Sequence, residues 1–318
     1  MTTAAAELRA LGGRLAAAPR ALAVAGALTI AFSSILVRLA DVAPSTAAIF
    51  RCAYALPLLG ALALWEDRRL GPRALRDRRL AAVAGVFFAA DLIFWHHAIA
   101  DVGAGLGTVL GNLQLVFVPL VAWALLREHP GAPVLAALPV VLIGVVLISG
   151  VLEDGAYGND PTRGVVFGAL TGLTYAGFLL VLRHGSSDLR RPAGPLFDAT
   201  AVATAAALVA GLALGEADLV PSWPAHAWLV TLALTSQVVG WLVIAISLPR
   251  LPAATTSLLL TIQPVGSVIL GAVLLGEEPT VLQLLGALTI LAGVIAVGRR
   301  GGGAPARCER AAPAGERT

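Results

Sequence analysis

The sequence predicts an all-α integral membrane protein of ten transmembrane helices, arranged as two inverted repeats of five helices each. Three observations predict this fold class. Hydrophobic residues make up 58% of the 318 residues and charged residues only 13%, whereas an average soluble domain carries about 25% charge. Apolar stretches of about 20 residues recur, and a helix of that length spans the ~30 Å hydrocarbon core of a bilayer. The third observation is an internal repeat.

The internal repeat relates the end of the chain to its middle. An apolar run, a polar turn with glutamate and proline, and a second apolar run occupy residues 252–298. The same order of residues occurs earlier in the chain, displaced by a constant interval. The chain therefore contains one two-helix unit twice. The aligned pairs include Gln263 with Gln114, Glu277 with Glu128, Pro279 with Pro130, Leu284 with Leu135 and Gly293 with Gly144.

The first repeat is predicted to occupy residues 21–150. Its first apolar run is too long for the apolar core of a secretory signal, so residues 1–20 are predicted to be a cytoplasmic N-terminal segment before an uncleaved helix. Gly103, Gly107 and Gly111 recur every four residues in the fourth helix, which is typical of a face that packs closely. Prolines within helices favour kinks. The five predicted helices are 21–40, 45–65, 80–100, 104–126 and 132–150.

The second repeat is predicted to occupy residues 163–298. The tetrapeptide Gly-Ala-Leu-Thr, which ends at Thr29 in the first predicted helix, recurs in the sixth and ends at Thr171. The last residues, 299–318, are rich in Gly, Ala, Pro and Arg and are predicted to form a disordered cytoplasmic tail. The five predicted helices are 163–183, 194–215, 225–247, 253–275 and 280–298.

The distribution of arginine predicts the orientation. With the N-terminus in the cytoplasm, 19 of the 22 arginines fall on cytoplasmic segments, while the outer segments carry mostly acidic residues. This satisfies the positive-inside rule and places both termini in the cytoplasm. Five helices per repeat is an odd number, so the second repeat enters the membrane upside down. Inverted repeats are typical of secondary transporters, in which a central site opens alternately to each side.

The composition also excludes several classes of function. The chain has no lysine, so it can form neither a P-loop ATPase site nor a pyridoxal Schiff base. Zinc-helix and serine-hydrolase motifs are absent, and Cys52 and Cys308 suggest no disulfide framework or metal site. The arginines are dispersed among loops, which argues against a nucleic-acid partner. We therefore expect no cofactor, no metal and no enzymatic activity.

The last two predicted helices resemble the closing segment of an EamA-type repeat of the drug/metabolite transporter superfamily. The residues that carry the resemblance are Pro264, Gly276-Glu277, Gln283, Gly286 and Gly293. Arg51, after Ala47-Ala48-Ile49-Phe50, resembles the arginine early in the family's second helix. The resemblance covers residues 21–298 and implies a ten-helix exporter or permease for small metabolites that uses no ATP. The first repeat departs from the pattern, because Leu115 stands where Pro264 predicts a proline, and Arg127-Glu128 replaces Gly-Glu.

Polar residues inside the predicted helices are the candidate substrate pathway, because such groups usually face the protein interior or a water-filled cavity. Gln114 and Gln263 are equivalent in the two repeats, and a side-chain amide offers both donors and an acceptor to a zwitterionic or amide-bearing solute. A hydrogen bond between helices is the alternative role. The candidates are Gln114, Gln263, Asn112, Tyr175, Gln237 and Trp241.

Charged and titratable residues form a second candidate set, for proton coupling or charge gating. Asp91 lies inside the third predicted helix, and desolvation favours protonation of a buried carboxylate. His96 or His97 could relay protons with it, but adjacent residues point about 100° apart on a helix, so both cannot face one cavity. Hydration near the outer interface is the alternative for them. Arg51 and Arg38 either bind a carboxylate or reach the headgroups. Asp198 either gates the cytoplasmic side or is a solvated helix end.

Together these features predict a secondary transporter of the plasma (inner) membrane. It would move a small polar metabolite by alternating access, with export of an amino acid or derivative favoured and proton coupling as a further hypothesis. The partners expected are the small polar solute and the lipid bilayer, and a homodimer is a further hypothesis. The alternatives are an importer or flippase of sugar- or nucleotide-linked solutes, or a non-transporting membrane scaffold.

Overall fold

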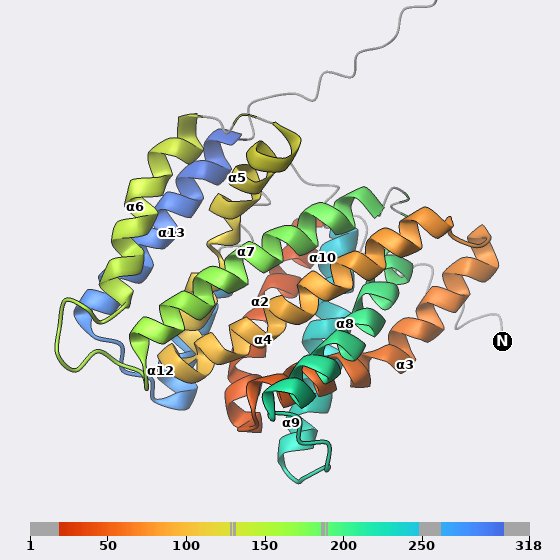
Figure 1. The fold of residues 1–318 in the computed structure, drawn as a ribbon, viewed down its shortest axis with the longest axis horizontal. Helices are drawn as coiled ribbons and strands as arrows, with labels where there is room; N and C mark the ends of the chain where they lie inside the picture. The colour runs from red at the N-terminus through yellow and green to blue at the C-terminus, as the bar shows by residue number, and fades with distance from the viewer. Residues whose placement is uncertain are drawn as a thin grey trace, which may run out of the picture.

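A computed structural model describes residues 19–127, 129, 132–185, 188, 190–247 and 262–301. Over these residues the chain is helical, with turns and irregular loops between the helices (Figure 1). The helices of the first half are α2 (Pro19–Ala40), α3 (Pro44–Leu70), α4 (Leu75–Gly111), α5 (Gln114–Leu126) and α6 (Ala132–Ile148). Those of the second half are α7 (Pro161–Gly185), α8 (Ala193–Leu214), α9 (Ala225–Leu232), the π-helical η1 (Ala233–Gly240), α10 (Trp241–Ser247), α12 (Ile262–Leu275) and α13 (Val281–Gly301).

The helices have the length and composition of a multi-pass membrane protein. Within the described residues, six helices are long and apolar enough to cross a bilayer, and four shorter apolar helices accompany them. Large apolar side chains are exposed on the outside of the bundle, for example Leu142, Val209 and Val273. An exposed apolar surface of this kind is costly in water and favourable in lipid. The outer surface of the bundle therefore suits a lipid environment.

The third and fourth predicted helices differ from their predicted bounds. Helix α4 continues past residue 100, with a sharp kink at Gly103 (φ 86°, ψ 169°), a conformation that only glycine adopts without strain. The predicted helix 104–126 is also interrupted at Asn112 and Leu113. There the Leu113 N–H donates to Leu110 O at 3.0 Å, a tighter turn than an α-helix, before α5 begins. The sequence prediction missed this second break.

Other predicted elements agree in position and differ in detail. The predicted helix 225–247 is a continuous path of α9, η1 and α10, so its middle is π-helical. The predicted helix 253–275 is described only from residue 262. Most of the predicted N-terminal segment and of the C-terminal tail lies outside the described residues, which begin at 19 and end at 301.

Helices α3 and α8 pack against each other in opposite directions. Glu66, near the end of α3, accepts hydrogen bonds from the backbone N–H groups of Ala193 (2.9 Å) and Gly194 (2.7 Å) at the start of α8. Glu216, just after α8, accepts a 2.6 Å hydrogen bond from the hydroxyl of Ser45 at the start of α3. The end of each helix thus satisfies polar groups at the start of the other, as antiparallel helices require.

Helices α6 and α13 form a second close antiparallel pair, at one side of the bundle (Figure 1). Two glycines allow the approach. A methyl group at Gly144 would lie 2.7 Å from Ile290 Cγ1, and one at Gly293 would lie 2.8 Å from Val141 Cγ2. Glycine is used here because any side chain would separate the helices.

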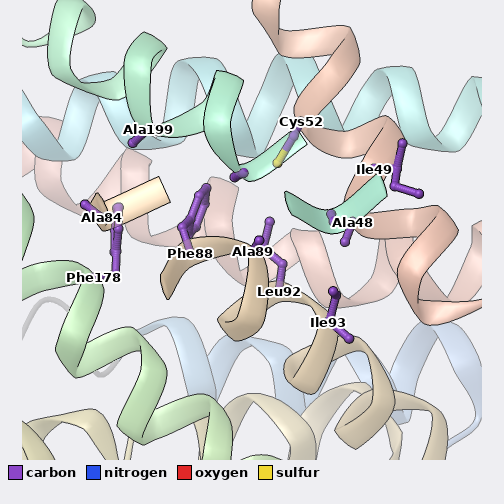
Figure 2. Packing of buried hydrophobic residues seen from close by; sticks show 12 residues of the cluster. Ala48, Ile49, Cys52, Ala84, Phe88, Ala89, Leu92, Ile93, Phe178 and Ala199 are labelled. Atoms are coloured by element: carbon purple, nitrogen blue, oxygen red, sulfur yellow. The ribbon is translucent and has the colours of Figure 1, made fainter. Parts of the chain in front are cut away.

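The core of the bundle joins α3, α4, α7 and α8 (Figure 2). Phe88 stacks on Phe178 with ring centroids 4.6 Å apart, and Cys52 is fully buried among alanines. Small residues such as Ala84 and Ala199 let the helices approach, and the aromatic pair fills the remaining volume. This core fixes the helices that carry most of the candidate site.

Candidate functional site

A cavity of about 80 Å³ lies among helices of both halves of the chain. Helices α2, α3, α4, α5, α7, α10 and α12 all contribute side chains, and Asn112 between α4 and α5 contributes another. A water needs roughly 10–15 Å³ of such space, so the cavity holds several waters or one small solute. Its polar lining consists of Ser33, Arg51, Asp91, Thr108, Asn112, Gln114, Thr171, Tyr175 and Gln263, with the indole N–H groups of Trp95 and Trp241.

Four of the lining residues carry a buried polar atom with no hydrogen-bond partner in the described part of the chain. They are Arg51 Nη1, Gln114 Oε1, Thr171 Oγ1 and Trp241 Nε1. A buried polar group without a partner costs roughly 1–3 kcal/mol, and in a membrane protein lipid cannot supply the missing bond. Donors and an acceptor that converge on one cavity therefore indicate a polar ligand or water.

Arg51 is held in a fixed orientation by residues from two other helices. Its Nε donates to Gln237 Oε1 at 3.0 Å, and Gln237 Nε2 donates to Thr200 Oγ1 at 3.3 Å. The guanidinium also lies 5.5 Å from the centroid of the Trp95 ring. Arg51 is only 3% exposed. These contacts leave Nη1 without a hydrogen-bond partner among the described residues.

Asp91 brings a carboxyl group to the same cavity. It is 7% exposed and forms no hydrogen bond or ion pair within the described part of the chain. Arg51 lines the same cavity. The cavity thus presents a guanidinium group and a carboxyl group to a bound molecule.

Aromatic side chains form a wall of the cavity. Tyr175 and Trp241 lie 6.0 Å apart between ring centroids in an edge-to-face arrangement, and Phe88 meets Trp241 in the same way at 6.0 Å. Edge-to-face pairs of this kind are favourable and rigid. The ring faces of these residues add apolar surface to the cavity lining.

The structure brings five of the six predicted pathway residues to this cavity. Gln114, Gln263, Asn112, Tyr175 and Trp241 line it, although the Asn112 amide donates back to Thr108 O at 2.9 Å. Gln237 does not line the cavity and lies behind Arg51.

The predicted charged set separates into three places. Asp91 and Arg51 line the central cavity, as described above. His96 and His97 do not, and their side chains diverge. His96 Nδ1 donates to Pro44 O at 3.0 Å, whereas His97 pairs with Glu216 at 3.4 Å and stacks on Phe167.

The two remaining charged residues lie at opposite ends of the bundle. Asp198 pairs with Arg73 at 2.7 Å, next to the turn between α3 and α4. Arg38 lines two other cavities near the turn between α2 and α3. Neither contacts the central cavity. Among the described residues, no group of three His, Cys, Asp or Glu side chains could hold a metal ion.

The sequence prediction missed Thr171, Thr108, Trp95 and Ser33 as lining residues. Thr171 had a signal, because it ends the tetrapeptide that the two repeats share. Its counterpart Thr29 is half-buried, and its hydroxyl donates to Ala25 O of its own helix. The tetrapeptide alone could not show which threonine faces inward.

Comparisons with known proteins agree with a membrane transport protein. The sequence model of the EamA-like transporter family matches residues 20–150 and 162–299. An uncharacterized transporter of Archaeoglobus fulgidus is 29% identical over 220 residues, which cover 69% of this chain and 76% of that protein. A solved crystal structure of a protein has a TM-score of 0.57 at 16% identity, covering 90% of this chain and 98% of the other, and this likeness shows the fold alone.

Proposed function

The chain belongs to the EamA-like transporter family, and from this premise we propose that it exports an amino acid or derivative by alternating access. The protein is a multi-pass membrane transporter of small solutes. The observation that carries the finer proposal is the convergence of unpartnered polar atoms with Arg51 and Asp91 on one buried cavity.

A zwitterion complements this cavity. Arg51 Nη1 offers a donor to a carboxylate, and Asp91 offers a carboxylate to an ammonium group. Gln114 Oε1 and Thr171 Oγ1 offer further hydrogen bonds, and the aromatic wall accepts an apolar side chain. A volume of about 80 Å³ suits a small head group, whereas sites for drug-sized ligands are typically ~300–1,000 Å³. This difference argues against a nucleotide-linked solute.

Alternating access requires two halves that can exchange conformations, and we propose ten helices in two inverted repeats, 21–150 and 163–298. The contacts between α6 and α13 support this. Gly144 meets Ile290 and Gly293 meets Val141, and the repeat alignment converts one contact into the other. Such reciprocity is expected of a pseudo-two-fold axis.

The wider packing gives the same support. Helix α3 pairs with α8, its repeat counterpart, while α2 packs on α9–α10 and α7 packs on α4. Each of the last two contacts is the repeat counterpart of the other. We propose that both termini lie in the cytoplasm, because most arginines fall on the segments that this orientation places there. Export through the plasma membrane is proposed from the family resemblance. The homodimer stays a prediction.

We further propose that protons drive export through Asp91. A proton and the ammonium group of the solute would compete for one carboxylate, so that each leaves as the other binds. Competition for one carboxylate couples inward movement of the proton to outward movement of the solute, and no second coupling site is needed. His96 and His97 are not needed for this coupling, because neither lines the cavity.

Counterflow in proteoliposomes tests the function. The twenty L-amino acids are screened as internal solutes against a trace of the same radiolabelled compound outside. We expect one chemical group of amino acids to accumulate label, and Arg51→Gln to abolish the accumulation, while the exposed Arg76→Gln does not. Absence of counterflow with every amino acid would reject this substrate class. If counterflow were also absent with every other class of solute tested, the result would favour the non-transporting scaffold.

A further inference from the structure

We propose a second solute site at the outer mouth of the pathway, formed by Arg38, Asp41 and His96. The proposal rests on the proposed function, since the site would take the same zwitterionic head group as the central cavity. Its ligand class is therefore a free amino acid or an amino-acid-like zwitterion. No such role follows from the family match.

The site consists of two adjoining cavities. One, of about 60 Å³, is lined by Arg38, Asp41, Pro44 and His96 among others. The other, of about 160 Å³, is lined by Arg38, Tyr157 and others. Arg38 and Ala100 line both, so the two cavities adjoin at these residues and are called the recess below.

Helices α2 and α4 both line the central cavity and the recess. On α2, Ser33 lines the central cavity and Arg38 the outer one. On α4, Trp95 lines the central cavity, and Ile99 lines the outer one. From Ser33 to Arg38 the rise along the helix is about 7.5 Å. A solute that leaves the central cavity along α2 and α4 would enter this recess next.

A thin apolar layer separates the two cavities. Ile35, Ala47, Ile99 and Ala104 belong to one cluster of the core, and each is at most 1% exposed. Glu277 fastens this layer to the α12–α13 turn, because its carboxylate accepts the Ala104 N–H at 2.5 Å and the adjacent N–H at 3.0 Å. The described conformation thus keeps the outer recess apart from the central cavity.

The recess carries the same kinds of group as the central cavity, with Arg38 and Asp41 exposed where Arg51 and Asp91 are buried. Arg38 and Asp41 form no hydrogen bond or ion pair within the described part of the chain. A carbonyl oxygen can only accept, so His96 Nδ1 must donate to Pro44 O, and Nε2 carries a lone pair. His96 is 1% exposed and its Nε2 has no partner among the described residues. A cation, a carboxylate and a neutral acceptor therefore converge, as Arg51, Asp91 and Gln114 do.

The backbone supports this arrangement. Asp41 adopts a positive φ of 48°, which is uncommon outside glycine and tolerated best by Asn and Asp. This turn directs the chain from α2 into α3 within three residues. It keeps Asp41 at the rim of the cavity that Arg38 and His96 line.

Equilibrium dialysis tests the site on the purified full chain in lipid nanodiscs, with each of the twenty radiolabelled L-amino acids in turn. For the amino acids that bind, we expect two molecules per wild-type chain and one per Arg38→Gln chain, with the affinity of the remaining site within twofold of wild type. Asp154→Asn, an exposed outer-loop change that leaves both cavities intact, should keep two.

The outcomes separate the two proposals. One molecule per chain in both wild type and Arg38→Gln overturns the outer site, leaves the central site standing and assigns Arg38 to headgroup contact. Absence of binding by all twenty rejects both proposals. A second readout is efflux from proteoliposomes against external amino acid. Arg38→Gln and His96→Leu should raise the external concentration for half-inhibition about tenfold without changing the internal KM, and equal inhibition in all variants would refute the site.

Discussion

At the scale of single residues, the protein buries a few polar side chains in the interior of a helical bundle whose outer surface is apolar. Arg51 is tolerated because Gln237 and the Trp95 ring contact it and Asp91 lies across the same cavity. An isolated buried charge is expensive, whereas a charge with partners on several helices is not. The same contacts fix the guanidinium, so its free Nη1 is ready for a ligand.

Gln237 is expected to act by positioning Arg51, because it contacts Arg51 and not the cavity. Gln237→Leu removes the acceptor of the Arg51 Nε–H and frees the guanidinium to rotate. We expect the KM for the solute to rise about tenfold, equivalent to ~1.4 kcal/mol, with little change in maximal rate. Gln237→Glu retains an acceptor and should restore most of the affinity. Equal KM values in all three proteins would show that Gln237 is only structural.

Asp91 is expected to carry the pH dependence of transport. If a proton and the solute compete for its carboxylate, acidifying the outside loads Asp91 with protons from that side, so efflux quickens as external pH falls. Asp91→Asn can neither bind nor release a proton, and its efflux should not respond to pH between 5.5 and 8, a range chosen around neutrality. Efflux is measured from loaded proteoliposomes, with Asp154→Asn as the control. A wild-type pH response in Asp91→Asn would exclude this coupling.

At the scale of elements, the positions where helices are interrupted or packed closely bear most on the candidate site. The kink at Gly103 and the interruption at Asn112 leave a short helical segment between them, whose first N–H groups bond to Glu277. The π-helical η1 carries Gln237. Irregular backbone inside a membrane bundle is tolerated only where protein or water satisfies it. Of these irregular positions, Asn112 lines the central cavity, and Gln237 on η1 accepts a hydrogen bond from the lining residue Arg51.

The α6–α13 contact is expected to be sensitive to side-chain size. Gly144→Leu would insert a side chain where even a methyl group lies 2.7 Å from Ile290, and overpacking typically costs about 1–3 kcal/mol. We expect the melting temperature of the detergent-solubilised protein to fall by several degrees, by the usual scale of ~2–4 °C per kcal/mol. Ala136→Leu, at an exposed position on the same helix, should leave it unchanged. Equal melting temperatures would contradict the close packing.

At the scale of the whole molecule, the proposed inverted repeat has a direct consequence for topology. The turn between α3 and α4 and the loop between α8 and α9 are counterparts in the two repeats. If the repeats are inverted, these counterparts face opposite compartments. If the repeats are parallel, they face the same one. The α6–α13 and α3–α8 contacts are both antiparallel, which favours inversion.

Cysteine labelling in intact cells tests the topology. Single cysteines are introduced at Arg76, in the first turn of α4 directly after the first counterpart, and at Asp218, in the second counterpart, in a background without Cys52 and Cys308. We expect a membrane-impermeant maleimide to label Asp218→Cys from outside and Arg76→Cys only after permeabilisation. Asp154→Cys, in the loop between α6 and α7, serves as the outer reference and should label with Asp218→Cys. Labelling of both counterparts from one side would disprove the inverted arrangement.

The sequence by itself determined the helical membrane fold, the family and most of the pathway candidates. An apolar run of bilayer length is expected to form a helix, because a helix satisfies the hydrogen bonds of its backbone polar groups within the segment. Polar residues in such runs are costly, so Gln114, Gln263 and Asp91 stood out from the sequence alone.

The tertiary structure decided which of those residues meet. The direction in which a side chain points depends on the rotation of its helix about the axis and on kinks in the helix. Neither of these follows from hydropathy. The sequence could not show that His96 turns to Pro44, that Gln237 lies behind Arg51, or that Thr171 faces inward while Thr29 does not. Those outcomes depend on close contacts between distant segments, such as Glu277 with Ala104. Long-range packing, rather than local pattern, sets the register of one helix against another.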